Sequence, residues 1–214
     1  MVFNVERAGS ENVGQISTIH LQAFQGEFLS SLGKGFLDAY YKNYLYGSDQ
    51  LLLVAKVQDK TIGFVSGTLN SEKFYQCLFK NNFFLITKLT LKSFLVNKNF
   101  RSHILKKQYF MKKAIKSRFL EKKTDKNNQK KKDVTNGKRC SLISIAVLDE
   151  FRGKGVAVDL VGRFEEEMKK LGASTCALYV KKENLRGVGF YKKTGWQTSP
   201  TQTNDSVKFT KDFC

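Results

Sequence analysis

The residues with the clearest chemical potential form a basic, glycine-rich turn at 152–157. The apolar run 141–148 before it is typical of a β-strand, and the pattern of 155–171 predicts a helix. The first N–H groups of a helix lack intrahelical acceptors and lie at the positive end of its dipole, so they bind anions such as phosphate. Small residues at Gly153 and Gly155 let the backbone approach an anion. The turn is therefore a candidate phosphate-binding site.

A second segment, 184–196, follows another strand-like run at 175–180. Together the two segments resemble the GNAT acetyltransferase superfamily, whose motifs are Q/R-x-x-G-x-G/A and N-x(6)-Y followed by a glycine and an aromatic residue. Here the motifs are matched by Arg152, Gly155, Ala157, Asn184, Tyr191, Gly195 and Trp196. The resemblance is specific over 141–199, extends through the order of predicted elements to 2–69, and does not include the segment between them.

The resemblance implies that acetyl-CoA is the acyl donor. Residues of the strand would pair with its pantetheine arm, and N–H groups of the turn and the following helix would bind its pyrophosphate. From the second motif, Asn184 would contact the cofactor and Tyr191 would lie near its sulfur. The cofactor contacts implied are Ile145, Ala146, Val147, Arg152, Gly153, Lys154, Gly155, Val156, Ala157, Val158, Asn184 and Tyr191. Only two histidines occur and the four cysteines are far apart, so we expect no metal.

The chemistry expected is direct attack of an amine on the thioester in a ternary complex. Negative charge then develops on the carbonyl oxygen, where the resemblance places the N–H of Val147, and a thiolate leaves, which the phenol of Tyr191 would protonate. The alternative for Tyr191, beside Phe190, is ordinary core packing.

A general base is harder to assign. Some GNAT relatives have a glutamate on the strand before the asparagine, but Tyr179 occupies that position here. Glu27, in the loop where the family binds acceptors, is a candidate base; a solvent-exposed surface glutamate and deprotonation through water are the alternatives.

The elements that must position these residues indicate one α+β layered domain over 1–214, with a GNAT-type central mixed sheet flanked by helices. A basic helical insertion at about 72–139 separates the third and fourth strands, and its 73–123 part predicts two or three amphipathic helices. The other predicted strands are 2–8, 51–57, 62–69, 196–199 and 206–210, and the other predicted helices are 10–24, capped by Ser10, 35–46 and 184–194.

The positive charge is concentrated in that insertion. The chain has a formal charge of +18, and residues 71–139 contain 20 Lys or Arg against four acidic residues, a net +16. Three interpretations stay open: a solvated helical lid, a dock for an acidic acceptor such as a nucleotide-linked sugar, and peripheral contact with anionic lipid. We do not expect a nucleic-acid partner; if one is bound, lysines without arranged aromatic or arginine readers predict salt-dependent affinity with little sequence preference.

The segment 28–37, together with the insertion, resembles a bacterial GNAT subgroup associated with surface polysaccharide synthesis. It favours a nucleotide- or lipid-linked amino sugar as acceptor, with a protein or peptide amine as the alternative. Two other classes remain as rivals, a nucleic-acid-binding protein and an acyl-CoA sensor built on the same scaffold. No secretory signal or bilayer-spanning run is apparent, so we expect a cytoplasmic protein, at the inner face of the membrane if lipid is bound.

Overall fold

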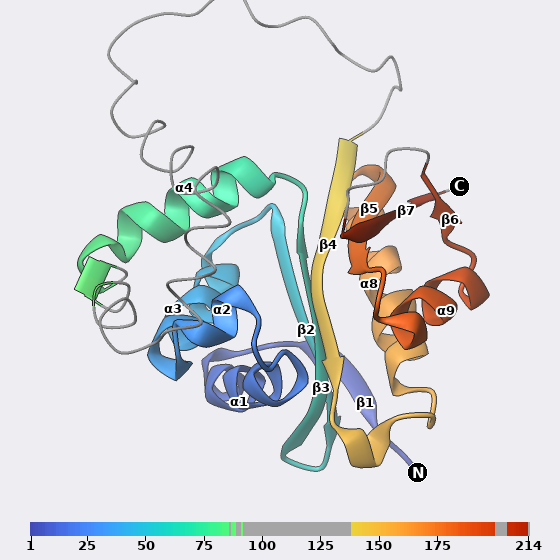
Figure 1. Ribbon diagram of the computed structural model, residues 1–214, viewed down its shortest axis with the longest axis horizontal. Helices are drawn as coiled ribbons and strands as arrows, with labels where there is room; N and C mark the ends of the chain where they lie inside the picture. The colour runs from blue at the N-terminus through green and yellow to red at the C-terminus, as the bar shows by residue number, and fades with distance from the viewer. Residues whose placement is uncertain (86, 89–90, 92–137, 200–204, 214) are drawn as a thin grey trace, which may run out of the picture.

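A computed structural model describes residues 1–85, 87–88, 91, 138–199 and 205–213 (Figure 1). Its seven-stranded mixed sheet has the order β1-β2-β3-β4-β5-β7-β6. The strands are β1 (Asn4–Arg7), β2 (Gln50–Val57), β3 (Lys60–Thr68), β4 (Lys138–Val147), β5 (Ala173–Lys181), β6 (Gln197–Thr198) and β7 (Ser206–Asp212). The helices include α1 (Val13–Ala23), α2 (Phe28–Ser31), α3 (Lys34–Asn43), α4 (Ser71–Asn81), α8 (Val156–Lys170) and α9 (Leu185–Lys193). The predicted mixed sheet with flanking helices is confirmed.

Both faces of the sheet are covered, and each supports a hydrophobic core. Helices α1, α3 and α4 lie on one side of β4, and α8 and α9 lie on the other (Figure 1). Along β2, Leu51 and Leu53 pack into the α8 core, whereas Leu52 and Val54 pack into the core under α1 and α3. This strand is a continuous apolar run because successive side chains point to opposite faces, both of which are buried.

Glycines in β3 allow α8 to approach the sheet closely. A Cβ atom at Gly67 would lie 2.4 Å from the ring of Phe164 on α8, and one at Gly63 would lie 3.3 Å from Leu160. Both distances are shorter than ordinary van der Waals contact. The absence of side chains at these two positions therefore sets the distance between the helix and the strands beneath it.

The start of the first helix differs from the prediction. A 3-10 turn at Ser10–Asn12 precedes α1, and Ser10 is not its cap. Instead, the N–H of Gly9 donates to Oδ1 of Asn12 at 2.9 Å. The four-residue helix α2 was also not predicted, because it is too short to show a periodic pattern. Of the predicted basic helices, α4 is observed at 71–81, and most of the remainder of the insertion lies outside the described residues.

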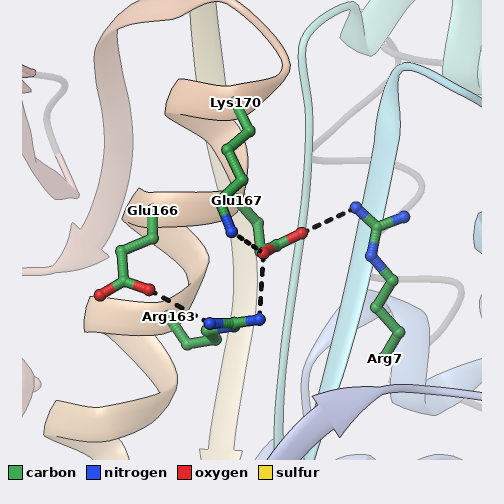
Figure 2. A network of polar contacts seen from close by, with 5 residues as sticks. All are labelled: Arg7, Arg163, Glu166, Glu167 and Lys170. Atoms are coloured by element: carbon green, nitrogen blue, oxygen red, sulfur yellow. Dashed lines mark hydrogen bonds and ion pairs between the residues drawn. The ribbon is translucent and has the colours of Figure 1, made fainter.

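A network of ion pairs fastens α8 to the first strand (Figure 2). The nearly buried carboxylate of Glu167 accepts from Arg7 of β1 at 2.9 Å, and from Lys170 and Arg163 of its own helix at 2.9 and 3.2 Å. Hydrogen bonds from Lys170 and Arg7 lower the pKa of Glu167 from 4.5 to about 2. The carboxylate is therefore ionised in the folded protein at neutral and mildly acidic pH.

We expect Glu167→Gln to lower the free energy of unfolding by about 2 kcal/mol at neutral pH, because charge-assisted hydrogen bonds are lost. Since the folded-state pKa is depressed, the wild-type stabilisation is fully present above 4.5 and is lost as the pH falls towards 2. Urea unfolding across this range should show that slope in the wild type and a weaker slope in the variant.

The matched control is Glu166→Gln, which removes a carboxylate that is 63% exposed and pairs only with Arg163 among the described residues. It should change stability little. Equal losses in the two variants would contradict the special role assigned to Glu167.

Candidate functional site

The site is organised by strands β4 and β5, which pair along only part of their length. They are parallel neighbours from Lys138↔Ala173 to Ser141↔Ala177. Beyond that point β4 continues along β3 and β5 continues along β7. Within the part of the chain that the structure describes, residues 142–147 therefore have no neighbouring strand on the β5 side. We call this the open edge of β4.

Backbone alternation fixes which groups face the open edge. The N–H of Leu148 donates to the carbonyl of Ile62 at 2.9 Å, which places the polar groups of residues 146 and 148 on the β3 side. The N–H groups of Ile145 and Val147 consequently point to the opposite side. That orientation is the one required of Val147 if its N–H is to stabilise charge on a carbonyl oxygen bound along the edge.

Arg152 holds the following turn against the strand. Its Nε donates to the carbonyl of Val147 at 3.1 Å, and its Nη1 pairs with Asp149 at 2.6 Å. The sequence suggested only that this guanidinium adds charge for an anion. The structure also gives it a positioning role, since it links the end of β4 to the glycine-rich turn.

The turn itself has the conformation that an anion site needs. Gly153 and Gly155 have φ angles of +76° and +86°, a region that other residues rarely adopt, and Gly155 caps α8. Helix geometry leaves the N–H groups of Val156 and Ala157 without intrahelical acceptors. The N–H of Val158 donates to the carbonyl of Gly155 at 2.9 Å, and its contact with the pyrophosphate stays a prediction.

A second lysine lies close to Lys154, the lysine of the turn. Nζ of Lys154 lies 5.5 Å from the ring centre of Phe151, and Nζ of Lys60, the first residue of β3, lies 5.4 Å from the same ring. Lys60 also pairs with Glu150 at 2.7 Å. The Phe151 ring thus gathers two ammonium groups beside the candidate phosphate site.

Tyr191 is in the core beneath the second motif. Its side chain is nearly buried, and its ring lies 5.6 Å from that of Trp196 and 5.7 Å from that of Phe209. Burial, with a smaller contribution from Cys176, raises the pKa of Tyr191 well above its usual value. The phenol therefore stays protonated at neutral pH, as an acid must, while its ring also serves the packing role that was the alternative.

Asn184 has an identifiable structural task. It caps α9, with its Oδ1 accepting from the N–H of Gly187 at 2.9 Å, and it is exposed. Contact between Asn184 and the cofactor stays a prediction.

The sequence did not identify the partners of Glu27. Its carboxylate forms an ion pair with Nζ of Lys181, at the end of β5. Nearby, His20 of α1 is buried, and its Nδ1 lies 2.6 Å from the hydroxyl of Tyr41, while its Nε2 has no partner among the described residues. Burial lowers the pKa of His20 to about 4, against an opposing effect of the Glu27 charge. The sequence could not predict these contacts or the lowered pKa, because a single histidine on an apolar helix face has no motif that indicates its partners.

Comparison with known proteins supports the superfamily resemblance. Residues 119–196 match the model described as the acetyltransferase (GNAT) family. A search of curated proteins finds no match.

Similar solved structures include the PaiA N-acetyltransferase of Thermoplasma acidophilum in complex with coenzyme A (16% identity, TM-score 0.57, 100% of both chains). They also include the ribosomal-protein-S18-alanine N-acetyltransferase of Escherichia coli (11%, 0.55, 98% of this chain and 92% of that one). NAA60 of Arabidopsis thaliana in complex with acetyl-CoA is a third (12%, 0.56, 99% and 98%). At these identities the likeness establishes the fold, and the GNAT-type fold prediction is confirmed.

No helix among the described residues is both long and apolar enough to cross a bilayer. No group of three or more His, Cys, Asp or Glu side chains within them is arranged to hold a metal ion.

We expect Gly155→Val to weaken acetyl-CoA binding roughly tenfold or more while the protein stays folded, because a β-branched residue is strained at a positive φ. The built Cβ meets no atom within 4 Å, so the effect arises from the backbone and not from a clash. Calorimetric titration with acetyl-CoA measures the affinity, and circular dichroism checks the fold.

Gly162→Ala is the control, because this residue lies inside the same helix and also has open space around it. It should leave the affinity unchanged. An unaltered dissociation constant in Gly155→Val would count against the turn as the cofactor site.

Proposed function

We propose that this chain is an acetyltransferase of the GNAT superfamily that takes acetyl-CoA as its donor and transfers the acetyl group to a primary amine by direct attack in a ternary complex, as the match of residues 119–196 and the likeness in fold support. The observation that supports this most is the open edge of β4, where the N–H of Val147 points away from β3. The same edge leads directly into the anion-binding turn. A thioester and a phosphate-containing carrier are thus offered separate, adjacent sets of N–H donors.

The residues of this chain then have distinct tasks. The N–H of Val147 stabilises the negative charge that develops on the carbonyl oxygen as the amine nitrogen bonds to the acetyl carbon. The phenol of Tyr191 gives its proton to the departing sulfur when the carbon–sulfur bond breaks. The proton lost by the amine passes to water or to Glu27, and the phenol is reprotonated from solvent, so protons balance over the cycle.

For the acceptor, we propose a nucleotide- or lipid-linked amino sugar. The segment 28–37 and the net +16 of residues 71–139 support it, since an anionic carrier would be attracted to that charge. We also propose that the same charge permits peripheral contact with anionic lipid from the cytoplasmic side.

A peptide amine is the second candidate. It is favoured by the similarity in fold to the E. coli protein, whose name specifies an alanine of ribosomal protein S18.

The test is calorimetric titration with acetyl-CoA, followed by an assay of thiol release with a nucleotide-linked amino sugar, an alanine-led peptide and spermidine as acceptors. Micromolar binding with turnover of the sugar is the expected result. Rapid turnover of the peptide alone would overturn the sugar proposal. Binding of acetyl-CoA with no turnover of any amine would favour a sensor.

We expect Tyr191→Phe to lower kcat by roughly 100-fold while the affinity for acetyl-CoA changes little, because only the acidic hydroxyl is removed. The control is Tyr46→Phe, at a tyrosine that is 71% exposed, which should leave both quantities unchanged. Steady-state kinetics with calorimetry decides between the two roles. An unchanged kcat in Tyr191→Phe would leave this residue with core packing only.

A further inference from the structure

The ion pair between Glu27 and Lys181 joins two parts of the fold that flank the open edge of β4. Glu27 lies in the turn between α1 and α2, on one face of the sheet. Lys181 is the last residue of β5, in the part of that strand that no longer pairs with β4. The pair therefore lies where an acceptor must come close to the acetyl group.

The backbone fixes both ends of the pair. The N–H of Glu27 donates to the carbonyl of Phe24 at 3.2 Å, and its own carbonyl accepts from the N–H of Ser31 at 3.0 Å. Lys181 is held opposite Ser206 in the ladder of β5 with β7. Both side chains thus start from backbone positions held by hydrogen bonds, and the pair can open by movement of the side chains alone.

Opening the pair costs little. The side chain of Glu27 is 34% exposed and that of Lys181 is 49% exposed, and pairs this accessible to water contribute about 0–1 kcal/mol. Glu27 is the main cause of the raised pKa of Lys181, but Glu183 and Asp205 contribute in the same direction. An ammonium released from Glu27 therefore remains near two other carboxylates.

A buried polar atom nearby also lacks a partner. His20 is only 3% exposed, and its Nε2 has no hydrogen-bond partner in the described residues. Glu27 is close enough for its charge to raise the pKa of this histidine against the effect of burial. Buried polar atoms are normally paired, so Nε2 of His20 beside this carboxylate is available to bond a polar ligand or an ordered water.

We propose that Lys181 is a specificity-determining residue of the acceptor site, whose ammonium occupies the position on Glu27 that the ammonium of the acceptor takes when it binds. The bound ammonium then loses one proton to water, and the neutral amine attacks. This inference rests on the proposed amine acetyltransfer and identifies the acceptor as a primary ammonium that can replace a lysine on a carboxylate. Lys181 competes with the acceptor and so raises its KM. Neutral nucleophiles gain nothing from Glu27 and are disfavoured.

The decisive variant is Lys181→Met, which keeps the length of the side chain and removes its charge. With glucosamine and an alanine-led peptide as probes, KM for the better acceptor should fall about 2- to 5-fold, with kcat nearly unchanged. Lys182→Met removes the same charge from the next residue, which is also exposed, and should leave KM unaltered. An unchanged KM in Lys181→Met, or an equal fall in both variants, would overturn the proposal.

Glu27→Gln completes a double-mutant cycle. This variant should raise KM about tenfold, and adding Lys181→Met to it should have no further effect, because the competition exists only when the carboxylate is present. A fall in KM on removing Lys181 in the Glu27→Gln background would show that Lys181 acts elsewhere.

A readout without turnover separates this inference from the proposed function. In protein with 13C-labelled lysine, the Cε signal of Lys181, assigned from its loss in Lys181→Met, should shift when glucosamine is added to the acetyl-CoA complex. The Lys182 signal should not move. A shift without turnover of any amine would support the ammonium site and contradict acetyl transfer, whereas turnover without a shift would overturn the role of Lys181.

Discussion

The structure depends on the point at which β4 and β5 stop pairing. Up to Ser141 the two strands share a parallel ladder, and beyond it each follows a different antiparallel neighbour. A strand edge with unpaired N–H and C=O groups is normally a liability. Here the edge lies inside the sheet, between layers of helices, so the same unpaired groups form a candidate binding site, and Arg152 and the glycine turn at the start of α8 follow directly from it.

Around this opening, close packing keeps the rest of the sheet rigid. The bare glycine positions of β3 let α8 sit directly on the strands, and the side chains of β2 fill both cores. Rigidity of this kind is what a backbone donor requires, since the N–H of Val147 must be aimed before charge develops and cannot turn towards it afterwards. Close packing of the sheet and the proposed role of the Val147 N–H therefore both depend on a backbone that does not move.

The part of the candidate site that lies within one short segment of the chain was predictable from sequence, whereas the part formed by contacts between distant residues was not. A strand, two glycines and a helix start within 141–157 determine the turn by short-range geometry, so its position was anticipated, although the bonded N–H of Val158 was not. The contact of Glu27 with Lys181 joins residues 154 positions apart, and no periodic pattern records it. The same holds for His20, whose burial depends on how α1 meets the sheet. The proposed acceptor side of the site is argued almost wholly from such contacts.

The bond between Arg7 and Glu167 spans 160 residues of sequence, and this has a consequence for biosynthesis. While a ribosome makes the chain, β1, β2 and β3 emerge long before α8. The apolar sheet face that Phe164 of α8 covers in the folded protein is therefore exposed to solvent during that time. Contacts of such separation slow folding and prolong exposure to aggregation. The nascent chain should accordingly keep apolar surface exposed until α8 and the later strands β5 and β7, which contribute to the same core, have left the exit tunnel.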